Sequence, residues 1–157
     1  MNVATIFQKT HPEKNSNILK IEYNTKAQKM SADVTKIRQI LLNLLSNSAK
    51  FTKEGTISIS VDDSKSQNDA IDFIISDTGI GMTKEQVDKV FKPFTQADEK
   101  TTRKFGGTGL GLTITKMFAE MMGGDIKLSS SEGKGTAFTV TIPLAVVDIK
   151  KQNEIVF

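Results

Sequence analysis

The spacing of apolar residues switches repeatedly between a helical and a strand period, and this alternation limits the possible folds more than any other feature. Apolar side chains recur at helical spacing over residues 34–50, directly after the expected N-cap Asp33. The helical spacing returns over residues 110–122, where Gly123-Gly124 ends it. Apolar and polar residues alternate, as in strands, over the ranges 18–23, 57–61, 71–75, 126–128 and 136–142.

A third, shorter helix is expected between the N-cap Thr83 and Phe91. Strands joined by short turns occur together with helices, so the pattern predicts an α+β fold with the helices on one face of the sheet. In the helix over 110–122, the expected apolar face carries Leu110, Ile114, Met117, Phe118 and Met121.

The composition is that of one globular domain. The chain has 157 residues, 38% hydrophobic and 25% charged, and its net charge of +3 is too small and too scattered to indicate nucleic-acid binding. It has no cysteine, which excludes disulfides and thiolate metal sites. No apolar run approaches the ~20 residues of a membrane helix, and no signal peptide is evident. We therefore expect a cytoplasmic domain without direct membrane contact, and any membrane anchor would lie outside this chain.

Three segments are expected. Residues 1–17 form a lead-in with a short helix that ends at Thr10-His11-Pro12. Residues 18–143 form the domain itself. Residues 144–157 show no clear pattern and are predicted to be a tail or linker.

The first helix carries a polar stripe on one face. Gln39, Asn43, Asn47 and Lys50 follow one another at spacings of four, four and three residues. A solvated helix face would explain such a stripe, but asparagine is a poor helix former and these residues lie among leucines. An amide oxygen in this position would suit Mg²⁺, which takes few protein ligands when phosphates supply the others.

Asp77 follows a strand and begins the segment Asp77-Thr78-Gly79-Ile80-Gly81-Met82. Glycines allow the backbone to approach a ligand closely, and a carboxylate at a strand end can accept a hydrogen bond from an exocyclic amine. A plain turn is the alternative, because Asp-x-Gly sequences commonly form turns.

Glycines also open the second strong helix, in the segment 106–112. Unpaired amides at a helix start bind anions, and glycine leaves room for phosphate. The segment is neither a dinucleotide fingerprint nor a Walker loop, because the required strand, acidic residue and Gly-Lys-Ser/Thr are missing. Arg103 and Lys104 could reach phosphates, although paired cations on a surface loop are usually only solvated.

In their order, these motifs closely resemble the sequence boxes of sensor histidine kinase catalytic domains, over about residues 18–143. The boxes are Asn43 to Phe51, Asp77 to Gly81, Phe91-Lys92-Pro93-Phe94, Gly107 to Leu112, and a further glycine box from Gly133 to Phe138. The run Thr101 to Gly107 is especially similar to kinases of the hybrid type.

The resemblance implies the Bergerat ATP-binding fold of the GHKL superfamily, a two-layer α/β sandwich in which a mixed, mostly antiparallel sheet is backed by three helices. It implies ATP and Mg²⁺ as cofactors, with Asn47 as the metal ligand. The residues implied in catalysis are Asn43, Asn47, Lys50 and Arg103. The residues implied in nucleotide binding are Phe51, Asp77, Gly79, Ile80, Gly81, Met82, Phe91, Phe94, Lys104, Gly107, Thr108, Gly109, Leu110, Gly111, Leu112 and Thr136.

Asn43 separates two branches of the superfamily. The hydrolysing gyrase, mismatch-repair and chaperone ATPases carry a glutamate at this position, one helical turn before the metal-binding asparagine. An amide cannot activate water as a carboxylate can. We therefore expect phosphotransfer to a histidine with slow intrinsic hydrolysis; a GHKL-type ATPase, a related serine kinase and a nucleotide-binding regulatory module remain the alternatives.

The phosphoacceptor histidine is not expected within this chain. His11 precedes a proline, lies outside any convincing coiled-coil helix, and is predicted to be an ordinary exposed histidine. The resemblance therefore implies two partners, a histidine-bearing dimerisation domain of the same protein and a response-regulator receiver domain. The isolated domain is expected to be a monomer that does not autophosphorylate.

Overall fold

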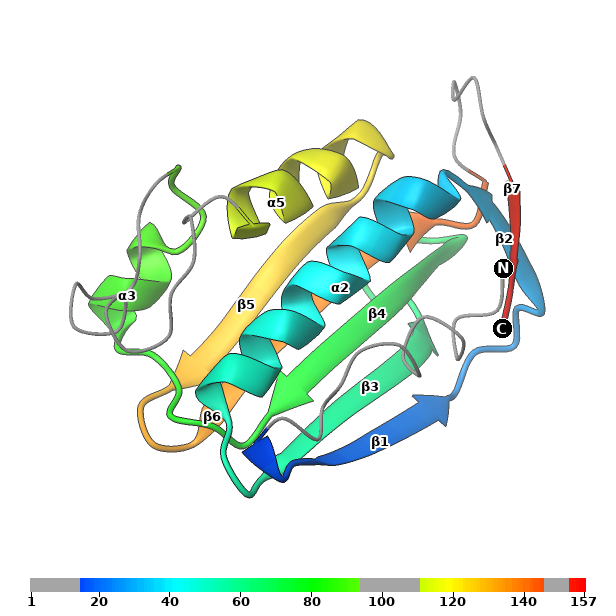
Figure 1. The fold of residues 1–157 in the computed structure, drawn as a ribbon. Helices are drawn as coiled ribbons and strands as arrows, with labels where there is room; N and C mark the ends of the chain where they lie inside the picture. The colour runs from blue at the N-terminus through cyan, green and yellow to red at the C-terminus, as the bar shows by residue number, and fades with distance from the viewer. Residues whose placement is uncertain (1–14, 94–110, 146–152) are drawn as a thin grey trace.

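The computed structural model describes residues 15–93, 111–145 and 153–157, and its centre is a five-stranded sheet (Figure 1). The strands lie in the order β1-β3-β4-β6-β5. β1 and β3 pair in parallel, whereas the other neighbours are antiparallel. The strands are β1 (Ile18–Tyr23), β3 (Thr56–Asp63), β4 (Ala70–Asp77), β5 (Asp125–Ser131) and β6 (Gly135–Pro143).

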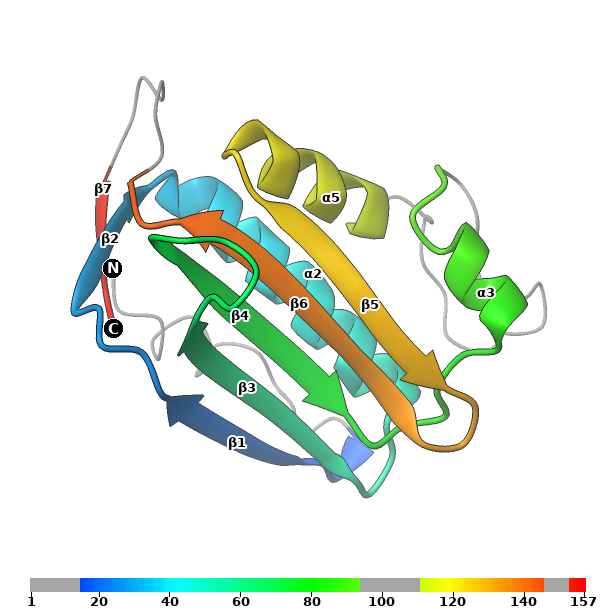
Figure 2. The same cartoon turned by 180° about the vertical axis from the view of Figure 1, so that it is seen from behind.

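The three described helices lie on one face of this sheet, and no described helix covers the other face, as Figures 1 and 2 show from opposite sides. They are α2 (Val34–Phe51), α3 (Lys84–Lys89) and α5 (Gly111–Met121). Asp33 caps α2 by accepting from the Lys36 N–H at 3.1 Å. Thr83 caps α3 through a reciprocal capping box with Gln86. The predicted two-layer α+β fold is therefore confirmed.

The hydrophobic core fills the space between α2 and the central strands. Leu41 and Leu44 of α2 are fully buried, as are Ile59 of β3 and Ile75 of β4. Their positions follow the helical and alternating periods of the sequence, which is why the sequence predicts this part of the core. Within the described residues, no helix combines the length and apolarity needed to cross a bilayer.

A second, two-stranded sheet is absent from the sequence prediction. β2 (Lys29–Ala32) pairs antiparallel with β7 (Asn153–Val156). Ile155 is completely buried, and the Phe157 ring packs against the Phe73 ring with centroids 6.3 Å apart. Each strand has only four residues, too few for a recognisable alternation. Part of the segment predicted as tail or linker thus forms a strand.

The predicted apolar face of α5 is only partly correct. Met117 and Met121 are 53% and 63% exposed, whereas Thr115 and Ala119 are fully buried. The helix is rotated so that its smaller side chains pack on the sheet and on α2, because small residues allow the closer approach. The expected lead-in helix and His11 lie outside the described residues.

Candidate functional site

Asp77 is the last residue of β4 and lies below the end of α2. Only 9% of its surface is exposed. Its Oδ1 accepts from the Gly79 N–H at 2.9 Å. Burial raises the pKa of the carboxyl above its usual value; the Gly79 N–H, the Ser48 and Thr52 hydroxyls and the Thr136 N–H oppose that rise. The site therefore holds a desolvated carboxylate surrounded by neutral donors.

The loop after Asp77 is pressed between α2 and the β5–β6 turn. A Cβ on Gly79 would lie 2.2 Å from the Phe51 carbonyl oxygen, to which the Ile80 N–H donates at 3.1 Å. Gly81 has φ +66°, and a Cβ there would lie 2.0 Å from the Ser131 carbonyl oxygen. These glycines allow contacts that no other residue permits. The backbone around Asp77 is thus fixed from both sides.

Asn43 joins α2 to the beginning of α5. Its Nδ2 donates to the carbonyl oxygen of Gly111 at 3.2 Å and to the Thr115 hydroxyl at 3.4 Å. Its Oδ1 accepts from Gln39 Nε2 at 2.9 Å. The structure therefore brings together the amide stripe and the end of the glycine-rich segment, which are 68 residues apart in sequence.

Asn47 and Lys50 lie one and two turns beyond Asn43 on α2, and both are half-buried. Within residues 15–93, 111–145 and 153–157, no three acidic, histidine or cysteine side chains gather as a metal site. An asparagine oxygen alone does not hold Mg²⁺, but it fits an ion whose other ligands are phosphate oxygens and water. The donor set thus suits a metal that arrives with a nucleotide.

Phe91 connects the segment after α3 to α5. Its carbonyl oxygen accepts from the Thr113 hydroxyl at 3.0 Å, and its ring meets the Phe138 ring edge-on at 6.4 Å. The Lys116 ammonium lies 5.7 Å from the centroid of the Phe91 ring. Phe91 therefore fixes the position of α5 relative to the segment that follows α3.

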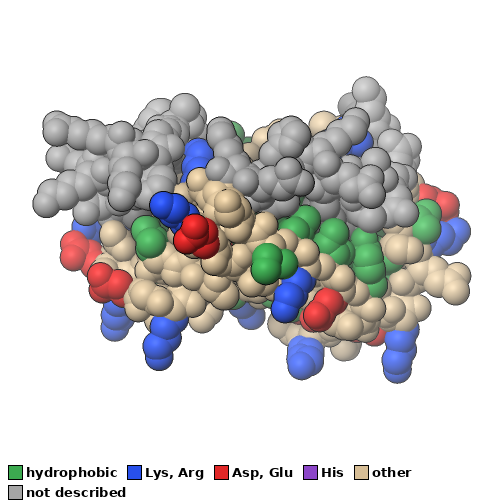
Figure 3. Space-filling model, turned by 60° about the horizontal axis from the view of Figure 1, so that its bottom comes forward, with side chains coloured by type: hydrophobic (Ala, Val, Ile, Leu, Met, Phe, Trp, Pro, Cys, Tyr) green, Lys and Arg blue, Asp and Glu red, His purple; other side chains and the backbone are tan. Residues whose placement is uncertain are grey.

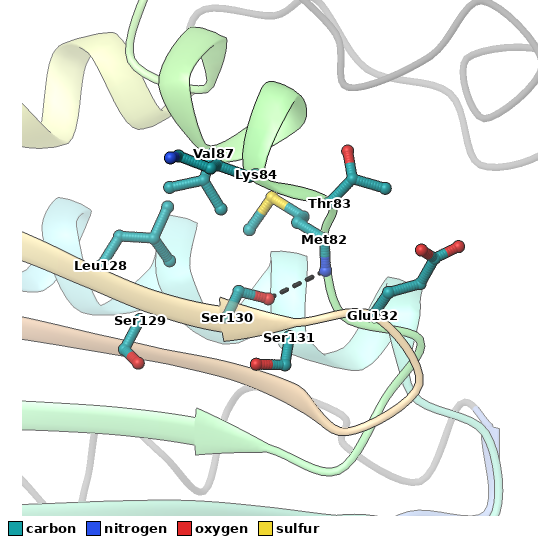
Figure 4. A pocket seen from close by; sticks show the side chains of 9 residues that line it. All are labelled: Met82, Thr83, Lys84, Val87, Leu128, Ser129, Ser130, Ser131 and Glu132. Carbon is teal, nitrogen blue, oxygen red and sulfur yellow. Dashed lines mark hydrogen bonds between the residues drawn. The ribbon is translucent and has the colours of Figure 1, made fainter.

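An open cavity of about 590 Å³ lies between α3 and β5 (Figure 4). The side chains of Met82, Val87 and Leu128 converge on it, and the Met82 N–H donates to Ser130 Oγ at 2.8 Å. Of the predicted site residues in the described part of the chain, only Met82 lines it. Asp77 and Asn47 do not, so the cavity adjoins the candidate site and is not its centre.

In the view of Figure 3, Lys and Arg side chains lie along the lower edge of the molecule, and Asp and Glu side chains lie between some of them and at the sides, so the described part of this face carries both charges.

Part of the predicted site lies outside the described residues. The described members are Asn43, Asn47, Lys50, Phe51, Asp77, Gly79, Ile80, Gly81, Met82, Phe91, Gly111, Leu112 and Thr136. The members outside are Phe94, Arg103, Lys104, Gly107, Thr108, Gly109 and Leu110.

Sequence reasoning missed the polar residues behind Asp77. Ser48 and Thr52 are buried, at 2% and 1% exposure, and neither hydroxyl has a hydrogen-bond partner of regular geometry in the described part of the chain. Ser48 occupies a helical position whose spacing matches the apolar face. A hydroxyl side chain at this position of the apolar face was the sequence signal that could have identified Ser48.

The fold and this arrangement define a class of nucleotide-binding protein. The family model described as "Histidine kinase-, DNA gyrase B-, and HSP90-like ATPase" matches residues 32–146. The chain belongs to this family, and the resemblance seen in the sequence is confirmed.

Within the family, the chain is similar to several histidine kinases. It is 50% identical over 120 residues to hybrid signal transduction histidine kinase A of Dictyostelium discoideum, covering 71% of this chain and 6% of that protein. It is 42% identical over 127 residues to the circadian input-output histidine kinase CikA of Synechococcus elongatus, covering 80% of this chain and 16% of that protein. The chain thus spans a small part of these relatives.

Solved structures of histidine kinases are also similar to this chain. Full-length ShkA in complex with AMPPNP superimposes with a TM-score of 0.78 and 25% identity, covering 93% of this chain and 30% of that chain. A catalytic domain of the histidine kinase ThkA superimposes with a TM-score of 0.68 and 28% identity, covering 82% and 81% of the two chains.

Proposed function

We propose that this chain is the ATP- and Mg²⁺-binding catalytic domain of a hybrid sensor histidine kinase, which donates the γ-phosphate to a histidine on a separate domain. The observation that carries the proposal is the buried Asp77 carboxylate, held between α2, β6 and a close-packed glycine loop. An acceptor desolvated in this way suits the exocyclic amine of adenine.

The adenine site lies around Asp77. Asp77 accepts from the amino group of the base, which favours ATP over GTP. Phe51 flanks the ring, Thr136 forms the floor, and the loop residues Gly79, Ile80, Gly81 and Met82 line the pocket. The register supports this arrangement, because Thr136 lies directly opposite Asp77 in the β4–β6 pair.

The phosphates lie toward α5. Asn47 binds Mg²⁺ through its side-chain oxygen, Lys50 meets phosphate charge, and Asn43 lies beside them. Arg103 and Lys104 contact the phosphates, and the amides around 107–112 cradle them. The contact between Asn43 and Gly111 supports a shared role for the two segments. Phe91 and Phe94 border the nucleotide site, in keeping with the sequence motif they form.

The reaction is phosphotransfer. Asn43 offers an amide where a hydrolytic enzyme needs a carboxylate to activate water. The γ-phosphate therefore waits for a stronger nucleophile, the imidazole of a histidine: its nitrogen attacks phosphorus, the bond to the bridging oxygen breaks, and ADP leaves.

Labelled ATP tests this proposal. Mixing the chain with a histidine-bearing dimerisation domain should yield acid-labile phosphate on that domain, and Asp77→Ala should abolish the label. The absence of transfer with every acceptor tried would contradict the proposal. Rapid steady-state hydrolysis by the chain alone would favour the alternative, a GHKL-type ATPase.

The proposal includes two partners, the dimerisation domain of the same protein and a receiver domain, within a cytoplasmic two-component phosphorelay. The hybrid histidine kinases among the relatives support this context. The isolated domain is expected to be a monomer, which sedimentation would test.

A further inference from the structure

Two buried hydroxyl groups, those of Ser48 and Thr52, lie near Asp77 at the C-terminal end of α2. Ser48 is in the last turn of α2, and Thr52 is the C-cap of the same helix, four residues later. Residues four apart share a helix face, so both hydroxyls approach Asp77 from the α2 side. A buried hydroxyl without a partner costs about 1–3 kcal/mol, so two of them beside one carboxylate require an explanation.

The immediate surroundings of Thr52 place its hydroxyl against the loop that follows Asp77. A Cβ on Gly79 would lie 2.7 Å from Thr52 Oγ1, which places this oxygen against the loop whose N–H already donates to Asp77. On the other side, the Thr52 methyl group would lie 2.6 Å from a Cβ on Gly55. The side chain thus has its methyl group turned toward Gly55 and its hydroxyl toward Gly79, whose N–H donates to Asp77.

We propose that Ser48 and Thr52 are positioning residues: their hydroxyls act on the Asp77 carboxylate and fix the orientation in which it accepts the amino group of the purine. The inference rests on the proposed function and extends it to base selectivity. With these hydroxyls in place, Asp77 presents a fixed acceptor, which matches the 6-amino group of adenine and not the 6-oxo group of hypoxanthine or guanine.

Neutral groups surround Asp77 in the described part of the chain. α2 presents Ser48 and Thr52, β3 presents Ile57 opposite Asp77, β6 presents Thr136, and the following loop presents Gly79. None of the causes that shift the pKa of Asp77 is a charged side chain. The hydroxyls are therefore among the few groups that offset the desolvation of the carboxylate.

Removing the hydroxyls should change how ATP binding depends on pH. Without them the pKa of Asp77 rises further, because the charged form loses two stabilising donors. The carboxyl then takes up a proton as the pH falls, and a protonated carboxyl is a poor acceptor for the amine. As the pH is lowered, the affinity of the variant should consequently begin to fall at a higher pH than the affinity of the unaltered chain.

The experiment compares Ser48→Ala, Thr52→Val and the double variant with Thr52→Ser, which keeps the hydroxyl. Calorimetric affinities for Mg-ATP and Mg-ITP are measured from pH 5 to pH 8. We expect the ATP-to-ITP affinity ratio to fall about tenfold in the double variant, an effect the size of one hydrogen bond. Thr52→Ser should retain both the ratio and the pH profile.

The outcomes separate the two proposals. If the unaltered chain does not bind ATP, the proposed function fails. If it binds ATP, and Asp77→Asn weakens binding while the folded double variant keeps the selectivity and pH profile of the unaltered chain, the inference about the hydroxyls is wrong. Circular dichroism identifies variants that do not fold, and Thr52→Val alone, which keeps the side-chain shape, then decides the question.

Discussion

The side-chain amide of Asn43 on α2 donates to the main-chain carbonyl of Gly111, the first described residue of α5, at 3.2 Å. Thr115 Oγ1 also donates to this carbonyl, at 2.9 Å. The Gly111 carbonyl in the first turn of α5 therefore accepts from both α2 and α5. The link connects the two helices that carry the candidate nucleotide site.

Asn43→Ala should therefore weaken both the fold and the site. We expect a loss of about 1 kcal/mol in the free energy of unfolding, because a half-buried amide loses its hydrogen bonds. Urea denaturation would measure this loss, and nucleotide affinity should fall as well. Gln39→Ala removes a single neighbouring bond and is the matched control; equal effects from the two variants would contradict a special role for Asn43.

Asp77→Asn should lower ATP affinity by about 10- to 100-fold, the range for a charged hydrogen bond of 1.5–3 kcal/mol. The amide has almost the same shape as the carboxylate, so the fold should persist. Calorimetry measures the affinity. An unchanged affinity in the folded variant would remove the adenine assignment.

The same substitution should stabilise the nucleotide-free domain at neutral pH. Burial raises the pKa of Asp77 in the folded state, so the folded protein binds more protons than the unfolded chain, and stability falls as pH rises from the unfolded to the folded pKa. The melting temperature of Asp77→Asn should exceed that of the unaltered chain at pH 7, and the difference should shrink toward pH 4. A difference that grows toward low pH would refute the argument.

Two glycines should respond in opposite ways to alanine. Gly79→Ala should cost more than about 1 kcal/mol in folding free energy, because its Cβ would meet the Phe51 carbonyl oxygen at 2.2 Å. Gly111→Ala should leave stability unchanged or raised, because a Cβ at this position would lie 3.8 Å from Asn43 Cγ, an ordinary van der Waals distance. Thermal melts compare the two. A loss of nucleotide affinity in the stable Gly111→Ala variant would support a close approach of phosphate.

The strand β7 should contribute measurably to stability. Ile155→Ala should cost about 2–4 kcal/mol, because Ile155 is completely buried. Val156→Ala is the matched control, since Val156 is 48% exposed and should cost far less. Similar denaturation midpoints for the two variants would show that β7 does not close the core.

The sequence predicted the elements with strong periodicity and missed those that depend on tertiary contacts. α2 and β4 carry clear patterns and turn signals, so both elements and the position of Asp77 at a strand end were predictable, although β4 extends beyond the predicted 71–75 to Ala70–Asp77. β2 and β7 each have four residues, and their pairing joins segments more than a hundred residues apart. No local pattern encodes such a pair.

Side-chain environments were harder to predict than elements. The rotation of α5 leaves Met117 exposed and buries Thr115, because packing against α2 selected the smaller side chains. The hydroxyls of Ser48 and Thr52 could be found only once the chain had brought α2 over Asp77. The roles of the predicted site residues remain predictions for the experiments above.

The parallel pairing of β1 with β3 has a mechanical consequence. Parallel neighbours cannot be joined by a hairpin, so the chain must travel the length of the sheet between them, and α2 lies on that path. The helix that carries Asn43 and Asn47 therefore follows β2 at its N-terminal end and leads into β3 at its C-terminal end. Because both ends of α2 continue into strands, a change in the width of the candidate site would require less rearrangement of α3 and α5 than of α2.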